Sequence, residues 1–308
     1  MTTTSSFMDR MLPFQVEGLD VRGRLVRLGP LLDDMCRGHD YPAPVATMLS
    51  EAAALALVLS SALKYDGLFT LQVQSDGPVG LMVVDVTSEG HVRGHARFDH
   101  DKVLAVAGQD GAVVPRLLGA GHMAFTVDQG PDTDRYQGIV ALEGATLTDC
   151  AHAYFRQSEQ METAIQITAR DGKAGHAAGA LMIQRLPDQD TGQNGGGDAG
   201  DDAWRRAVVL MSSLSTEELL DGKLDGETVL FRLYHEDGVR VFPPLGLAHV
   251  CRCSRERVGR TLKSFPRDEI MELAEDGGGD AGRRVTVTCE FCKTVYAFAE
   301  SDLDALFA

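Results

Sequence analysis

The sequence predicts an α+β core domain over residues 1–187, a helical linker region over 188–247 and a small C-terminal domain with a β-hairpin knuckle over 248–308. Three observations predict this division. Short segments of alternating apolar and polar residues are joined to helical segments without strict alternation, which is typical of α+β domains. The composition changes at Pro187 to a run of Asp, Gln, Asn and Gly that ends at Asp202, and such a run buries too little apolar surface to fold. Four of the six cysteines lie beyond residue 250.

The overall composition restricts the classes of function. With 308 residues, of which 44% are hydrophobic, the chain can bury a full core. The net charge of -16 disfavours non-specific attraction to nucleic acid or anionic lipid. Residues 1–6 are polar and precede no apolar segment, so no secretory signal is expected. We therefore expect a cytoplasmic protein without membrane association, in a compartment where thiols stay reduced.

Short elements follow one another in the first domain. An edge strand is expected over 21–28 and a short helix over 31–36. After Pro44, apolar residues recur at helical spacing up to Leu63, which predicts a buried central helix; Glu51 and several hydroxyl residues interrupt the apolar run, so no membrane span is expected. A helix capped by Thr146 is expected up to residue 157. Further strands are expected over 69–74, 81–86, 91–98, 123–128, 136–142, 163–169 and 178–186.

Three amphipathic helices are predicted beyond the Gly-rich run. Ser215 is placed to cap the second of them. The three helices either form a small bundle or lie on the first domain, and the sequence leaves both arrangements open. Their apolar faces carry Trp204, Val208, Met211, Leu214, Leu230, Leu233 and Tyr234.

The four clustered cysteines form two tight pairs, Cys251-Arg252-Cys253 and Cys289-Glu290-Phe291-Cys292. Metal ligation and disulfide chemistry are the two explanations for such clustering. Ser254 is placed to cap a helix, and a second helix is expected to open at Pro266. Strand residues flank the second pair, which is the pattern of a zinc-ribbon knuckle whose thiolates bind Zn²⁺ at about 2.3 Å. Four thiolates close the coordination shell, so no catalytic metal and no enzymatic activity are predicted.

A domain of this size buries little core, so zinc would supply its folding free energy, about 10–16 kcal/mol in comparable peptides. Oxidation of the thiolates to disulfides would release the metal, and a disulfide across one intervening residue is strained and easily reduced. The pattern therefore indicates a reversible switch, with a purely structural zinc site as the alternative. His249 is a weaker candidate ligand beside four thiolates. Cys36 and Cys150 lie in apolar helical segments and are predicted to be buried.

The cysteine pairs and several other segments resemble a known family, the 33 kDa chaperonins, which are redox-regulated bacterial holdases. The resemblance rests on Cys251-Arg252-Cys253-Ser254-Arg255-Glu256-Arg257 together with Cys289-Glu290-Phe291-Cys292. It extends over nearly the whole chain through His39-Asp40-Tyr41-Pro42, Lys64-Tyr65-Asp66-Gly67, Ser75-Asp76-Gly77-Pro78, Arg135-Tyr136-Gln137-Gly138, Thr216-Glu217-Glu218-Leu219-Leu220, Arg232-Leu233-Tyr234-His235-Glu236 and Leu273-Ala274-Glu275-Asp276-Gly277.

The resemblance implies an ATP-independent chaperone that is inactive when reduced and bound to one zinc ion. It implies that Cys251, Cys253, Cys289 and Cys292 are the ligands and form the disulfides Cys251–Cys253 and Cys289–Cys292 on activation. It further implies a metastable linker, unfolded client proteins as partners, and a homodimer when oxidised. The apolar faces of the linker helices are the candidate client surface. Glycine-rich insertions near Gly195 and Gly277 depart from the family pattern and bear on the threshold of the switch.

Parts of the sequence are also compatible with two other functions. A zinc-ribbon protein that binds nucleic acid is suggested by an excess of basic residues around the first cysteine pair, although the global acidity opposes it. A thiol-disulfide oxidoreductase is suggested by the second pair alone and is weakened by the hairpin context. The basic residues are Arg252, Arg255, Arg257, Arg260, Lys263 and Arg267.

Overall fold

The computed structural model describes residues 7–130, 133, 135–158, 161–170, 175–187, 198–276 and 283–307. The contacts divide the chain into two compact units, which are Met1–Cys36 with Asp40–His249 and Arg37–His39 with Val250–Ala308. Helices that the sequence placed in a separate linker therefore pack within the first unit. The behaviour of 188–247 as a segment of its own stays a prediction.

The first sheet of the first unit has the strand order β10-β1-β2-β9-β8, with β11 paired to β1. Strand β2 (Val21–Leu28) pairs with β1 (Arg10–Val16) on one side and β9 (Ala177–Arg185) on the other. The expectation of an edge strand over 21–28 was therefore wrong, because β1, whose pattern Pro13 interrupts, was not anticipated. The remaining strands are β8 (Thr163–Arg170), β10 (Val239–Val241) and β11 (Leu245–Gly246).

The second sheet has the order β12-β5-β4-β3-β6-β7 and is antiparallel apart from the β12–β5 pair. Its longer strands occupy the segments that the sequence predicted. Strand β12 lies at one edge and β7 at the other. The strands are β3 (Leu68–Ser75), β4 (Val79–Thr87), β5 (His91–Phe98), β6 (Gly121–Asp128), β7 (Tyr136–Ala141) and β12 (Ala248–His249).

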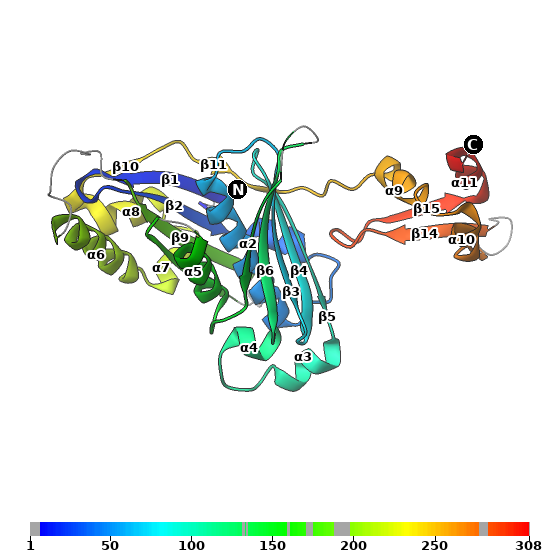
Figure 1. The fold of residues 1–308 in the computed structure, drawn as a ribbon, viewed down its shortest axis with the longest axis horizontal. Helices are drawn as coiled ribbons and strands as arrows, with labels where there is room; N and C mark the ends of the chain where they lie inside the picture. The colour runs from blue at the N-terminus through cyan, green and yellow to red at the C-terminus, as the bar shows by residue number, and fades with distance from the viewer. Residues whose placement is uncertain are drawn as a thin grey trace, which may run out of the picture. The chain divides into compact units, whose positions relative to one another are not determined.

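The predicted core helix is present as α2 (Ala43–Ala62), which lies between the two sheets (Figure 1) and contacts strands of both. By length and composition α2 could cross a membrane, but 78% of its apolar window is buried inside the protein. Its alanines let strands approach closely on both sides. The core helix of the first unit is thus confirmed.

Four shorter helices, all before β8 in the chain, also belong to the first unit. Helix α1 (Pro30–Cys36) and α5 (Leu147–Ser158) were expected from the sequence. The Thr146 hydroxyl accepts a hydrogen bond from the Asp149 amide at 3.1 Å, which confirms the predicted N-cap. Helices α3 (His100–Val106) and α4 (Val113–Leu117) were not predicted, because both are short and weakly periodic.

Helices α6 (Asp198–Ser212), α7 (Thr216–Leu220) and α8 (Gly226–Tyr234) pack on the face of the first sheet opposite α2. Of the two arrangements left open, the one on the core domain is therefore observed. Ser215 caps α7 in a capping box with Glu218, as predicted. Helix α6 begins inside the segment that was expected to be linker.

Arg27 of β2 connects the end of α7 and the turn before α8 to the first sheet. Its side chain is fully buried, with 0% exposure. The guanidinium donates to the Leu219 carbonyl at 2.9 Å and to the carbonyls of Asp221 and Leu224. These three carbonyls lie at the end of α7 and in the turn that leads to α8, where no helical amide reaches them. One buried cation thus satisfies the polar backbone at this junction.

The second unit is a three-stranded sheet of β13 (Glu275–Asp276), β14 (Arg283–Thr288) and β15 (Val295–Ala299) with three helices. The hairpin and the helices α9 (Arg255–Leu262) and α10 (Arg267–Glu272) confirm the predicted elements. Helix α11 (Glu300–Phe307) was not predicted. Gly195 and Gly277 lie outside the described residues. The buried core of this unit is small and consists of Leu262, Ile270, Ala274, Val285, Phe298 and Leu303.

Candidate metal centre

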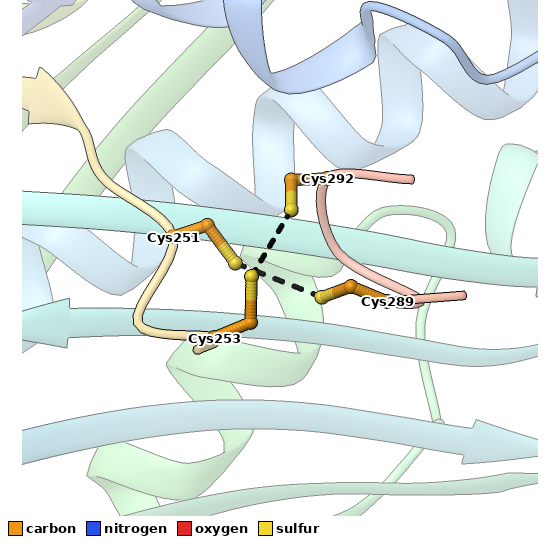
Figure 2. A group of neighbouring side chains, drawn as sticks. All are labelled: Cys251, Cys253, Cys289 and Cys292. Carbon is orange, nitrogen blue, oxygen red and sulfur yellow. Dashed lines mark hydrogen bonds between the residues drawn. The ribbon is translucent and has the colours of Figure 1, made fainter. Parts of the chain in front are cut away.

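The four clustered cysteines converge from two loops of the second unit. Cys251 and Cys253 lie just before α9, and Cys289 and Cys292 lie in the turn between β14 and β15. Figure 2 shows the four sulfur atoms pointing toward one another, and all four Sγ atoms lie within 4.8 Å of each other. The structure thus brings together the four residues that the sequence singled out.

Two close sulfur contacts each join a cysteine of one loop to a cysteine of the other. Cys251 Sγ lies 3.7 Å from Cys289 Sγ, and Cys253 Sγ lies 3.4 Å from Cys292 Sγ (Figure 2). Four sulfurs held at about 2.3 Å from a tetrahedral ion stand about 3.8 Å apart. All four cysteines are free thiols. The cluster therefore has the spacing of a tetrahedral four-thiolate metal site.

The backbone of the hairpin turn fixes the second cysteine pair. The Cys289 amide donates to the Thr294 carbonyl at 2.9 Å, and the Lys293 amide donates to the Cys289 carbonyl at 2.9 Å. Lys293 adopts a left-handed conformation with φ of 57°, which is uncommon outside glycine. This turn directs both thiols to the same side of the loop.

The metal-free thiols differ in their electrostatic environment. Burial raises the pKa of Cys253 to about 12, and burial also raises the pKa of Cys289. Burial acts in the same direction on Cys292, but hydrogen bonds with the Thr294 side chain and backbone and with the thiols of Cys253 and Cys251 together outweigh it, so the pKa of Cys292 falls to about 7. Four thiols packed this closely share protons, and a divalent cation would replace those protons.

Two polar side chains beside the cluster escaped the sequence analysis. The Tyr296 hydroxyl donates to Cys253 Sγ at 3.1 Å, and Thr294 Oγ1 lies 3.2 Å from Cys292 Sγ. Hydrogen bonds of this kind stabilise the thiolate form of a ligand. Both residues follow Cys292 closely in the chain. The alternation of side chains along β15 was the sequence signal that could have placed Tyr296 on the side of the strand that faces the sulfur atoms.

The basic segment after the first cysteine pair is partly neutralised within its own unit. Ser254 caps α9 by accepting from the Arg257 amide at 3.2 Å, as predicted. Arg255 forms an ion pair with Asp302 at 2.8 Å and lies 4.2 Å from the Phe298 ring centroid. Arg267 forms an ion pair with Asp304 at 2.6 Å. Two of the six basic residues therefore hold α11 in place.

The remaining cysteines and His249 lie in the first unit. Cys36 and Cys150 are buried, as predicted, and burial raises the pKa of each to about 11. His249 belongs to β12 and pairs with β5. Within the described part of the chain, the metal-ligating group consists of the four cysteines alone.

The apolar residues proposed from the linker helices form the core between those helices and the first sheet. The candidate client surface is therefore covered in this structure. Five of its members are buried and two are partly buried against them. The buried five are Met211, Leu214, Leu230, Leu233 and Tyr234, and the other two are Trp204 and Val208.

Comparison with known proteins gives a consistent result across the whole chain. A family model described as Hsp33 protein matches residues 9–299. A 33 kDa chaperonin of Caulobacter vibrioides is 42% identical over 296 residues, covering 94% of each chain. One of Pseudomonas aeruginosa is 39% identical over 303 residues, covering 98% of this chain and 96% of its own. The crystal structure of a 33 kDa chaperonin from Thermotoga maritima aligns with a TM-score of 0.78 over 97% of this chain and 98% of its own at 22% identity, which supports the fold.

Proposed function

This chain belongs to the Hsp33 family, and from this premise we propose that it is an ATP-independent holdase chaperone controlled by a zinc-thiolate switch. Family membership and the names of the relatives support a chaperone. The four-sulfur cluster carries the proposal of a switch. No catalytic step is part of it.

Zinc is the metal that the donor set favours. Soft thiolates in a tetrahedral arrangement select Zn²⁺ or an iron–sulfur cluster, and sulfur separations of 3.4 and 3.7 Å suit one ion at the centre. We propose Cys251, Cys253, Cys289 and Cys292 as its ligands in the reduced protein. With six buried residues in its core, the second unit depends on the bound metal for its fold.

Oxidation would remove the metal that supports the fold of the second unit. One thiolate of each pair reduces a peroxide to form a sulfenic acid, and the neighbouring thiol displaces water to close a disulfide. Each pair loses two electrons, so two peroxides oxidise four thiols. We propose Cys251–Cys253 and Cys289–Cys292 as the disulfides of the active form, with the metal released because disulfide sulfurs are poor ligands.

The active form would bind unfolding proteins through apolar surface that is now covered. The seven residues from Trp204 to Tyr234 lie in the interface between helices α6–α8 and the first sheet. Loosening those helices would expose both sides of that interface to a client. We propose that the oxidised protein acts as a homodimer in the cytoplasm, where reduced thiols are maintained at rest.

The test compares reduced and oxidised protein on one client. The reduced protein is expected to contain one zinc per chain and to show all of its cysteines as free thiols in a thiol titration. It is also expected to leave a thermally unfolding client free to aggregate. Peroxide at elevated temperature is expected to release the zinc, remove four thiols and switch on suppression of light scattering. Size exclusion of both forms tests the homodimer.

Serine variants separate the cluster from the other cysteines. Cys253→Ser is expected to lose the redox control of chaperone activity, whereas Cys36→Ser, which changes a buried thiol outside the cluster, keeps it. Equal suppression of aggregation by reduced and oxidised wild type would refute the switch. Retention of zinc and thiols after peroxide would reduce the cluster to a structural site.

A further inference from the structure

Strand β7 ends the second sheet with an open backbone edge. Its Gly138 and Val140 lie opposite Phe125 and Met123 of β6. The Leu142 amide bonds to the Gly121 carbonyl one step further along. Because antiparallel ladders alternate, Gly138 and Val140 bond to β6, while the amides of Gln137, Ile139 and Ala141 point away from it.

These outward amides form no hydrogen bond in the part of the chain that the structure describes. Of the three outward carbonyls, that of Ala141 accepts from the Glu143 amide at 2.9 Å. Ile139 is 58% exposed. The open edge of β7 therefore presents unpaired donors and acceptors in register beside an exposed apolar side chain.

The other long edge strands are blocked by side chains. At β8, the Ile165 amide donates to His152 Nε2 at 2.9 Å. At β15, Arg255 Nη1 donates to the Ala297 carbonyl at 2.7 Å, and the Ala299 amide donates to Asp302 at 2.9 Å. Proteins protect sheet edges in this way, or with charges, prolines and short strands. Strands β10 and β12, with three and two residues, have the last of these protections.

Strand β7 has none of these protections and is held firmly on its inner side. Its sequence Tyr-Gln-Gly-Ile-Val-Ala contains neither a charge nor a proline. A Cβ at Gly138 would lie 2.5 Å from the Tyr154 ring, so the strand packs directly on α5. The hydroxyls of Tyr136 and Tyr154 lie 2.6 Å apart. The edge is thus a preformed template for one more strand.

We propose that the edge of β7 binds an extended, uncharged segment of an unfolding polypeptide by adding it to the second sheet. Backbone pairing is indifferent to sequence, which suits clients that share only their unfolded state. The uncharged edge and exposed Ile139 favour apolar segments. A second copy of the chain that pairs edge to edge with β7 is the alternative occupant, and the concentration dependence of the exchange experiment distinguishes it. The inference rests on the proposed chaperone function: the β7 edge, which is open in this free-thiol structure, holds one part of the client, and the interface under α6–α8, exposed on oxidation, holds the rest.

Amide hydrogen exchange of the oxidised full-length protein tests the proposal. The probe is reduced, carbamidomethylated α-lactalbumin, which is permanently unfolded and carries no added charge. On binding, the amides of Gln137, Ile139 and Ala141 are expected to exchange at least about tenfold more slowly, because each gains a hydrogen bond. Gly138 and Val140, already bonded to β6, are expected to stay unchanged. This alternation is a signature that general burial would not produce.

Substitutions at the edge give a second readout. Ile139→Pro removes an outward amide without removing a bond to β6 and is expected to weaken probe binding about tenfold. Ile139→Thr keeps the amide and is expected to bind more tightly than the proline variant. Leu104→Thr on α3, where the leucine is 55% exposed, controls for loss of an exposed apolar side chain and is expected to match wild type.

The outcomes separate this proposal from the chaperone function. If wild type holds a thermally unfolding client while the three amides exchange as before, the edge proposal alone fails. Equal probe affinity of Ile139→Pro and wild type would likewise refute the edge proposal alone. If the three amides exchange more slowly without the probe, and increasingly so at higher protein concentration, the edge binds a second copy of the chain. If wild type holds no client in either redox state, both proposals fall.

Discussion

Replacing Arg27 by methionine tests how firmly α7 and α8 are held on the first sheet. Methionine keeps most of the apolar stem but removes the guanidinium that donates to the carbonyls of Leu219, Asp221 and Leu224. Burial lowers the pKa of Arg27, and the nearby Asp221 and Asp225 act in the opposite direction. The substitution therefore removes the side-chain donor to the carbonyls of Leu219 and Leu224, whereas the Asp221 carbonyl still accepts from the Leu224 amide at 3.1 Å.

The size of the effect follows from the bonds that are lost. A hydrogen bond to a charged group contributes about 1.5–3 kcal/mol, so three such bonds contribute roughly 5 kcal/mol or more. Burying the guanidinium costs several kcal/mol, and the carbonyls regain some water when the helices loosen. We expect the docking of α7 and α8 to weaken by about 3 kcal/mol, which raises the undocked population roughly 100-fold.

Residue-resolved amide exchange in the reduced, zinc-loaded protein measures this population. Amides of α7 and α8 are expected to lose about 100-fold protection, while those of β3 and β6 keep theirs. The reduced variant is also expected to suppress client aggregation in part, because undocked helices expose the candidate client surface. Arg24→Met is the matched control on the same strand, since the Arg24 side chain bonds only to the neighbouring Gly23 carbonyl among the described contacts.

Unchanged exchange of α7 and α8 in Arg27→Met would show that apolar packing alone holds these helices. Undocked helices without any chaperone activity in the reduced state would refute the link between linker docking and client binding.

Three further predictions concern the metal, its surroundings and pH. Chelation of the metal is expected to unfold the second unit and leave the first folded, because zinc contributes about 10 kcal/mol or more to such domains; persistent exchange protection in β14 and β15 would contradict this. Tyr296→Phe removes the donor to Cys253 and is expected to speed zinc release by peroxide about tenfold, followed with a zinc indicator, whereas Tyr136→Phe should release zinc at the wild-type rate. Burial raises the pKa of Glu51 to about 7 from 4.5. The folded protein therefore binds a proton that the unfolded chain releases, and stability falls as pH rises from about 4.5 to 7. Glu51→Gln should accordingly gain up to about 3 kcal/mol over wild type at pH 8 and nothing at pH 4 in urea unfolding, and an equal difference at both pH values would rule out this titration.

The sequence by itself determined the parts of this protein that depend on neighbours along the chain. The period of apolar residues after Pro44 fixed α2, and the hydroxyls of Thr146, Ser215 and Ser254 marked helix starts, because capping is a contact within one turn. The two cysteine pairs predicted one metal site, because the two ligands of each pair are already close in the sequence. The fold has only to bring the two pairs together. Missed elements such as α3 and α4 were too short to show a period.

The tertiary structure alone decided what depends on sheet order and on partners far apart in sequence. Arg27 meets Leu219 across 192 positions, and β2 is interior because β1 and β9 flank it. The strand order of the second sheet leaves β7 at an open edge, and apolar packing puts the linker helices on the first sheet. The Tyr296 hydroxyl reaches Cys253 only because a hairpin folds back on the loop before α9. Local patterns encode faces and ends of elements, whereas their neighbours are selected by packing of the whole chain.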